Sequence, residues 1–189
     1  MNYPLSEQRI RENFKDHIAT LTEHGDLKVL DWKMPESIFY YIRYVFDGNK
    51  IYITGDLGEA VFCLTWKADI HSFNDIGLGY FHEKLKAYHE DKYDFDSDKA
   101  IKRLRGWLNE LKDYGIEYDH DEMRELFEGA RGCSEEWEWV EVVHEHDDFI
   151  SDLDVDYWEW FYNIGRVYPM RFQSYLIGLQ MASEQLKEG

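Results

Sequence analysis

The sequence predicts an α+β protein in which a small antiparallel sheet precedes a mostly helical region. Strand-type alternation of aromatic and β-branched residues is concentrated before residue 79, and a helical period of apolar residues dominates after it. Strands followed by a run of helices are typical of folds that segregate helices from a sheet. With 189 residues, 44% of them hydrophobic, the chain can bury a sizeable core. We therefore expect one domain, 1–189, with a sheet-containing half, 1–78, and a helical half, 79–189.

An amphipathic helix is predicted near the start of the chain. Apolar residues recur there at helical spacing and stop at a glycine, which commonly ends a helix: Ile10, Phe14, Ile18 and Leu21, followed by Gly25. We expect this helix to extend as far as that glycine.

An antiparallel meander is predicted next. Residues 38–46 are aromatic and β-branched, 47–49 supply turn residues, and 50–54 resume the same composition. After a second turn, residues 60–66 alternate in strand fashion, and 27–32 form a candidate fourth strand. The sequence therefore predicts a three- or four-stranded antiparallel sheet.

About six or seven helices are predicted, and most of them lie in the second half. Apolar stripes at helical spacing mark residues 81–88, 101–111, 123–130 and 170–186. Residues 134–146 fit a helix or a strand, and helix is favoured because Trp137, Val140 and His144 keep helical spacing. Asp96 to Asp98 are interpreted as a helix-capping cluster, since the calcium-loop glycine and glutamate are missing from the residues that follow.

Most of the net charge of −18 lies in one block of the sequence. Residues 117–159 hold seventeen acids and two bases, a net charge of −15. This excess disfavours direct contact with nucleic acid or with an anionic membrane surface, and it favours a basic protein partner. The alternative is a solvated face that keeps the protein in solution.

Tryptophans are interleaved with the acids of this block. Trp137 and Trp139 are two residues apart, so on a helix they cannot both face the same core, and an exposed one would be a candidate anchor for a partner. The residues predicted to bind a partner are Glu135, Glu138, Glu141, Glu145, Asp147, Asp148, Asp152, Asp154, Trp137 and Trp139.

The sequence contains no pattern typical of a catalytic, nucleotide-binding or zinc site. We therefore expect no catalytic residue, no metal and no cofactor. A structural zinc is the alternative, held by His144 and His146 with Asp147 or Asp148, or by Cys63 and Cys133 with a histidine. The two cysteines are otherwise expected to be reduced thiols, since they are too few for a disulfide scaffold.

No part of the sequence resembles a signal peptide or an apolar stretch long enough to cross a membrane. We therefore expect a cytoplasmic protein.

Two segments, ITGDLGEAVFCLTW (residues 53–66) and DIGLGYFHEKL (residues 75–85), resemble small proteins carried by phages and integrated elements of Firmicutes. Some acidic proteins of that setting are anti-CRISPR inhibitors of the type II-A effector Cas9. The resemblance implies a host-defence antagonist that blocks the positively charged nucleic-acid path of Cas9 and prevents loading of target DNA. It transfers no functional residue.

Two other functions remain open. One is an acidic adaptor or regulator that binds another basic bacterial protein. The other is a metal-containing enzyme of a mobile element, which the missing catalytic patterns disfavour.

Overall fold

The computed structural model describes residues 5–188 and divides the chain into two compact units. The sheet unit comprises Met1–Lys92 together with Pro169–Gly189, and the helical unit comprises Tyr93–Tyr168. The α+β class is confirmed. The units meet in the sequence at 92/93 and 168/169, not at the expected 78/79, because the last helix returns to the sheet.

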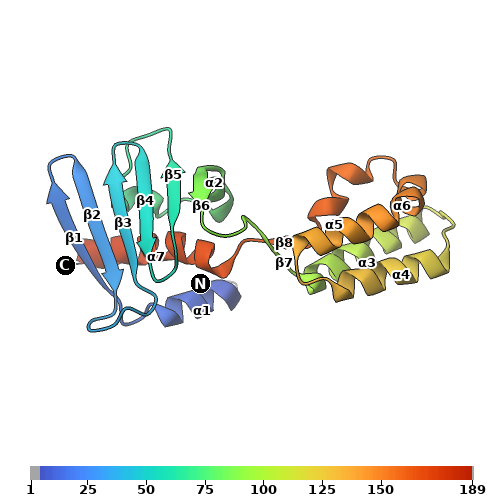
Figure 1. Ribbon diagram of the computed structural model, residues 1–189, viewed down its shortest axis with the longest axis horizontal. Coiled ribbons are helices and arrows are strands. Elements are labelled where there is room, and N and C mark those ends of the chain that lie inside the picture. Colours follow the sequence, from blue (N-terminus) through green and yellow to red (C-terminus); the bar gives the residue numbers. More distant parts are fainter. Residues whose placement is uncertain (1–4, 189) are drawn as a thin grey trace. The chain divides into compact units, whose positions relative to one another are not determined.

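The sheet unit contains a six-stranded antiparallel sheet, larger than the three or four strands that the sequence predicted (Figure 1). Its strands follow one another in chain order: β1 (Ile18–His24), β2 (Leu27–Lys33), β3 (Ile42–Asp47), β4 (Lys50–Gly55), β5 (Ala60–Cys63) and β6 (Leu85–Tyr88). The helices of this unit are α1 (Leu5–Asn13), the 3-10 helix η1 (Ile70–Phe73), α2 (Leu78–Glu83) and α7 (Met170–Glu188). The predicted meander is confirmed as β2 to β5, but its last strand ends at Cys63 and not at residue 66.

The first helix is shorter than the sequence predicted. It ends at Asn13, and Ile18 and Leu21 lie in β1. This strand pairs with β2 along its whole length through a turn at Gly25, whose φ is 65°. The helical spacing was misleading because a paired neighbour supplies the backbone hydrogen bonds of β1, and its β-branched residues suit a strand.

The region predicted as a helix over 81–88 is also divided. The helix α2 ends at Glu83, and residues 85–88 form β6, which pairs with β5. The backbone N–H of Cys63 donates to the carbonyl of Lys84 at 2.9 Å, which continues this edge of the sheet. Residues 85–88 therefore form a strand, because hydrogen bonding to β5 stabilises this segment more than continuation of the helix would.

The strand predicted from residue 38 begins only at Ile42. Residues 38–41 form a loop in which Ile38 and Phe39 are exposed. Tyr40 has a φ of 57°, and its backbone N–H donates to the Asp56 carboxylate at 2.7 Å. Aromatic composition alone did not distinguish this loop from a strand.

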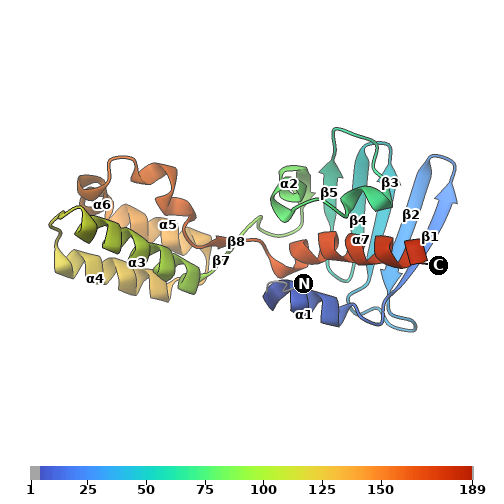
Figure 2. The same ribbon diagram turned by 180° about the vertical axis from the view of Figure 1, so that it is seen from behind.

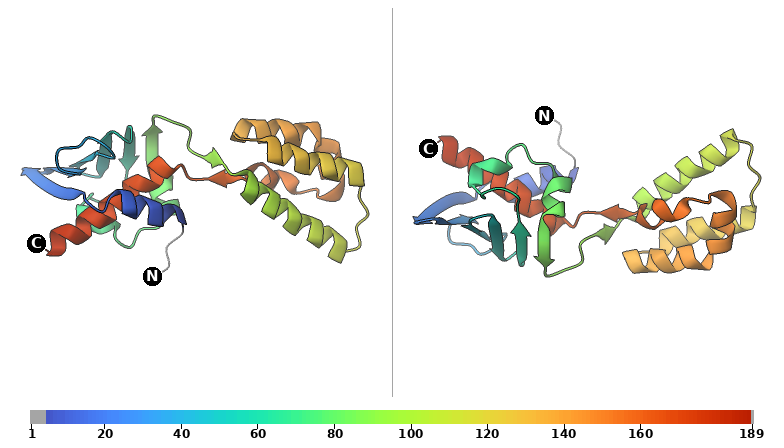
Figure 3. Two further views of the ribbon diagram at one scale, coloured as in Figure 1. Left: turned by 90° about the horizontal axis from the view of Figure 1, so that it is seen from below. Right: turned by 90° about the horizontal axis from the view of Figure 1, so that it is seen from above.

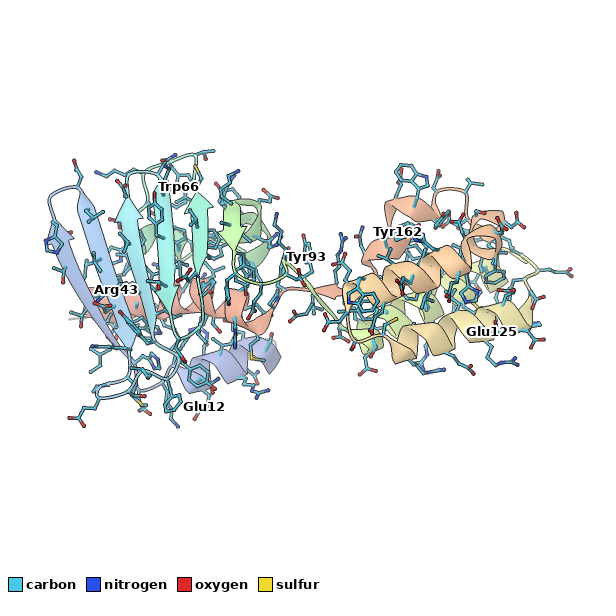
Figure 4. The ribbon with its side chains drawn as sticks, viewed as in Figure 1. Glu12, Arg43, Trp66, Tyr93, Glu125 and Tyr162 are labelled. Atoms are coloured by element: carbon cyan, nitrogen blue, oxygen red, sulfur yellow. The ribbon has the colours of Figure 1, made fainter. Side chains whose placement is uncertain are left out.

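One face of the sheet is covered by α7, with α1 beside it (Figure 2). Alternate residues of β2 and β3, such as Trp32 and Tyr44, are buried on that face. The opposite face is open to solvent, and Arg43 lies on it (Figure 4).

Two buried hydrogen bonds hold α7 to the rest of the sheet unit. The Tyr44 hydroxyl donates to the carbonyl of Tyr175 at 2.9 Å and joins the helix to the sheet. The Tyr175 hydroxyl donates to the carbonyl of Leu57 at 2.7 Å and joins the helix to a loop.

The approach of α7 to the sheet is closest at Gly178. A Cβ atom at this position would lie 2.6 Å from the Tyr44 hydroxyl oxygen and 3.2 Å from Cδ1 of Trp32. A glycine inside a helix costs stability relative to alanine, so this one is explained by the lack of room against the sheet.

The helical unit begins and ends with a two-stranded pair, β7 (Asp94–Phe95) and β8 (Arg166–Val167). Its helices are α3 (Ser97–Asp113), α4 (His120–Gly132), α5 (Glu136–Glu145), α6 (Asp147–Leu153) and the 3-10 helices η2 (Tyr157–Glu159) and η3 (Phe161–Asn163). The helix favoured over 134–146 is confirmed by α5. The capping role of Asp96 is also confirmed, because its carboxylate accepts the N–H of Lys99 at 2.9 Å.

The core of the helical unit is rich in aromatic residues. Trp139 of α5 is fully buried and donates its indole N–H to the carbonyl of Phe161 at 2.9 Å. Trp107 of α3 meets the Phe161 ring edge-on at 5.2 Å. Figure 3 shows α4 and α5 side by side, and both contribute to this core. No helix described in residues 5–188 is long and apolar enough to cross a membrane.

His17 is buried in the sheet unit with incomplete hydrogen bonding. Its Nε2 lies 3.2 Å from the carbonyl of Tyr40, while its Nδ1 has no partner among the described residues. The ring packs against Phe14 and Trp32, and this burial lowers the pKa of His17.

We expect Gly178→Ala to lower the free energy of unfolding by about 1–3 kcal/mol, because the added methyl group overpacks the contact with Tyr44. The matched control is Gly106→Ala in α3, where the nearest atom is Arg103 Nη1 at 3.6 Å. That change should raise the free energy of unfolding by up to about 1 kcal/mol, as helix propensity predicts. Urea unfolding measures both variants, and stabilisation by Gly178→Ala would contradict the close approach.

Lowering the pH below about 6.5 should reduce the stability of the sheet unit, because the unfolded chain then binds a proton at residue 17 that the folded chain excludes. The stability is present above this pH and falls as the pH decreases through it. His17→Gln should reduce the slope of the free energy of unfolding against pH by up to about 1.4 kcal/mol per pH unit. Urea unfolding at neutral and mildly acidic pH checks this, and an unchanged slope would mean that folded His17 takes up the proton.

Candidate partner-binding surface

Helices α5 and α6 bury one face in the core of the helical unit. Trp139, Val143 and Ile150 are buried at helical spacing along this face. His146 lies between the two helices and places Nδ1 2.9 Å from the carboxylate of Glu122 on α4. The opposite face of α5 and α6 is left to solvent.

The solvent face carries a row of exposed side chains spaced three or four residues apart, which we call the acidic stripe: Trp137, Glu141, Glu145, Asp148 and Asp152. None of its four carboxylates forms an ion pair or hydrogen bond with any other residue in 5–188. The sequence has no lysine or arginine between Arg131 and Arg166. The stripe continues from α5 to α6 across His146, which separates the two helices with a non-helical φ of −107° and ψ of 17°. It is therefore a surface of uncompensated negative charge with an aromatic side chain at one end.

Most of the acidic stripe does not stabilise the helices that carry it, and the exception is Asp148, which is in the first turn of α6, where the helix dipole favours a negative charge. Glu141 and Glu145 are four residues apart, as are Asp148 and Asp152, and like charges at this spacing destabilise a helix by about 0.2–0.5 kcal/mol per pair. Glu145 is also the last residue of α5, where the helix dipole disfavours a negative charge. The arrangement costs stability, which argues for a role outside folding.

The two tryptophans of α5 have opposite environments. Trp137 is 60% exposed, whereas Trp139 is fully buried. The expectation that they cannot share one core is confirmed. Trp139 belongs to the core and is not available to a partner, although the sequence placed it in the binding set; its neighbour Trp137 is the candidate anchor.

Three of the predicted acids have local structural partners. Glu138 accepts the backbone N–H groups of Ser134 at 2.6 Å and Glu135 at 3.0 Å, and these bonds lower the pKa of Glu138. Asp154 accepts the indole N–H of Trp160 at 3.0 Å, and Asp147 accepts the hydroxyl of Tyr157. Glu138 therefore caps α5, while Asp147 and Asp154 hold the segment after α6. The fourth acid outside the stripe, Glu135, is exposed but is the N-cap residue of α5 and forms a capping box with Glu138.

Exposed apolar residues next to the last acids were not predicted as a site. Trp158 is 60% exposed and Val155 is 80% exposed. They lie around η2, which is too short for a helical period to reveal which side chains face solvent. The alternation of Trp158 with acids was visible in the sequence, but its exposure was not.

The acids of α4 differ from those of the stripe, because arginines accompany them. Arg124 lies 2.9 Å from the carboxylate of Asp121, and Arg131 is in the last turn of the helix. Two further acids of this helix are exposed, Glu125 and Glu128, and Figure 4 labels the first of them. Helix α3 contains five bases and three acids. Helix α4 has four acids and two arginines, whereas 136–159 has ten acids and no lysine or arginine, so most of the uncompensated charge belongs to α5, α6 and the segment after them.

The described residues offer no metal site, since no group of three or more histidine, cysteine or acidic side chains in 5–188 could hold an ion. Cys63 and Cys133 are free thiols in different units. Burial raises the pKa of Cys133.

One pair of side chains has the composition of a nucleophile and a base. His71 Nδ1 lies 2.8 Å from Ser183 Oγ. Ser183 is fully buried, so no substrate can reach its hydroxyl. The pair therefore links η1 to α7 and does not form a catalytic site.

The chain matches no protein-family model, and no curated protein or solved structure is significantly similar to it. The resemblance to proteins of phages and integrated elements stays a prediction, as do the partner and the inhibition that it implies.

Replacing Glu145 with lysine should stabilise the helical unit by about 0.5–1 kcal/mol. The change removes a like-charge pair with Glu141, creates a favourable pair at the same spacing, and places a positive charge at the C-terminal end of α5. Thermal unfolding measures the effect, with Glu145→Gln as the control that removes the repulsion alone. A loss of stability in the lysine variant would indicate a structural role for this carboxylate.

Proposed function

We propose that this protein acts by binding a basic protein partner through the acidic stripe on α5 and α6. The observation that carries the proposal is the exposed row of four carboxylates without any described cation, in which the like charges four residues apart and the position of Glu145 at the end of α5 lower stability. Residues that cost stability without serving the fold are expected at binding surfaces.

The two kinds of side chain in the stripe have different roles in this proposal. The carboxylates attract and orient a positively charged surface, which mainly raises the rate of association. Trp137 supplies a large apolar contact that a partner can bury, which mainly slows dissociation, and tryptophan is enriched among residues that dominate binding energy. Val155 and Trp158 supply further exposed apolar area in the same unit.

The specific partner that we propose is Cas9, with the positively charged nucleic-acid path of the nuclease as the contacted surface. An acidic protein bound there would compete with target DNA for the same basic groups and prevent its loading. This choice rests on the resemblance of residues 53–66 and 75–85 to mobile-element proteins, and the charge of the stripe is compatible with it.

The test measures Cas9 binding and target-DNA loading with the purified protein, using bare and guide-loaded Cas9. We expect a complex that reduces DNA loading, with association that slows as the salt concentration rises. Glu141→Lys combined with Asp148→Lys should slow association by roughly tenfold or more at low salt. Trp137→Ala should mainly speed dissociation, by roughly tenfold or more.

The matched control is Glu125→Lys combined with Glu128→Lys, which changes the net charge equally on α4 of the same unit. This variant should associate nearly as fast as the wild type. Equal loss in both double variants would exclude the acidic stripe as the specific contact. Unchanged DNA loading at excess protein would exclude Cas9 as the target and favour an adaptor for another basic protein.

A further inference from the structure

A hollow of about 440 Å³ lies on the sheet unit, remote in sequence from the acidic stripe. It is bounded by the segment after β5, by η1 and by the start of α2. The residues that line it are Trp66, Ser72, Asp75, Ile76, Gly77 and Tyr80. Its volume is within the range of small-ligand sites, although the hollow is shallow and open to solvent.

Two aromatic rings form a fixed wall of the hollow. The indole N–H of Trp66 donates to the hydroxyl oxygen of Tyr80 at 3.1 Å, and the Trp66 ring packs against the buried Phe73 at 5.3 Å. The hydrogen bond from Trp66 lowers the pKa of Tyr80. The two rings are therefore held by each other, and Trp66 also by Phe73, so they do not have to be ordered by a ligand.

The polar groups of the hollow are acceptors. Asp75 is exposed, and its carboxylate has no ion pair or hydrogen bond with the rest of the described chain. The Ser72 hydroxyl also lines the hollow. The neighbouring Lys84 is not a lining residue, but its Nζ lies 4.4 Å from the centre of the Tyr80 ring, so this lysine already covers one face of the ring and an incoming cation has to use the rest of the hollow.

We propose that this hollow binds the guanidinium group of an arginine side chain presented by a protein partner. A guanidinium is planar and weakly hydrated, it stacks on aromatic rings, and its five N–H groups match carboxylate and hydroxyl acceptors. The hollow offers all of these features: the Trp66 and Tyr80 rings, the carboxylate of Asp75, and the hydroxyl of Ser72.

The open shape of the hollow favours an arginine on a polypeptide over a free small molecule. Small-ligand sites usually bury most of the ligand surface, whereas a shallow hollow leaves part of it in water. An arginine on a protein has a backbone and neighbouring residues that can make further contacts beyond the hollow. The site is independent of the acidic stripe, because it belongs to the other unit and its test uses a different probe.

The experiment follows the indole N–H resonance of Trp66 by heteronuclear NMR on the full chain, with Trp66→Phe used to assign the signal. The probe is a five-residue peptide, acetyl-Gly-Ser-Arg-Ser-Gly-amide, and the neutral comparison replaces its arginine with citrulline, which has nearly the same shape. We expect a saturable shift with the arginine peptide and none with the citrulline peptide. Asp75→Asn should weaken the affinity by about tenfold, because it removes a charge-assisted hydrogen bond.

Asp91→Asn is the matched control, since Asp91 is another exposed, unpaired carboxylate of the sheet unit and its loss changes the net charge equally. It should leave the affinity for the arginine peptide unchanged. Equal weakening by both variants, equal binding of both peptides, or no saturable shift would overturn the proposal. Equal affinity for acetyl-arginine amide and for the peptide would overturn the choice of a protein partner, because the additional backbone would then contribute nothing.

Discussion

The packing of α7 against the six-stranded sheet is the constraint on which the architecture depends. This helix is the last element of the chain, yet it covers the buried face of a sheet built from residues 18–88. Gly178 permits the close approach, and buried hydrogen bonds of Tyr44 and Tyr175 hold α7 to the sheet unit. The chain must therefore leave the sheet unit after β6 and return to it, and the helical unit is an insertion between these two points.

The helical unit tolerates its charge because its stability comes from another source. The core around Trp139, Trp107 and Phe161 is aromatic, and Arg166 donates to the Glu136 carboxylate at 2.7 Å where β8 meets α5. Stabilisation by burial is independent of the charges on the solvent face, apart from their mutual repulsion. One face of α5 and α6 can thus satisfy the fold while the other presents uncompensated carboxylates.

The two candidate surfaces use related chemistry in different forms. The acidic stripe spreads charge along two helices, which suits attraction over a distance to a basic surface. The hollow at Trp66 and Tyr80 combines one carboxylate with two held rings, which suits recognition of a single planar cation. In both proposals the ligand is basic: the acidic stripe would attract it through long-range charge, and the hollow would recognise its planar shape.

The sequence by itself determined the α+β class, the approximate positions of β2 to β5, the helices α3, α4 and α7, and the location of the acidic block, because local period, turn residues and charge are properties of neighbouring residues. It favoured a helix where α5 lies but left a strand open there. Only the tertiary structure decided that Ile18 and Leu85 belong to strands, since neighbouring strands supply the backbone hydrogen bonds of these segments.

The tertiary structure also decided which acids have no partner. Glu138 and Asp154 are held by local hydrogen bonds, whereas the carboxylates of Glu141 and Asp148 are not. The division between buried Trp139 and exposed Trp137 follows from which face of α5 meets the core, and the composition of a single segment does not contain that information.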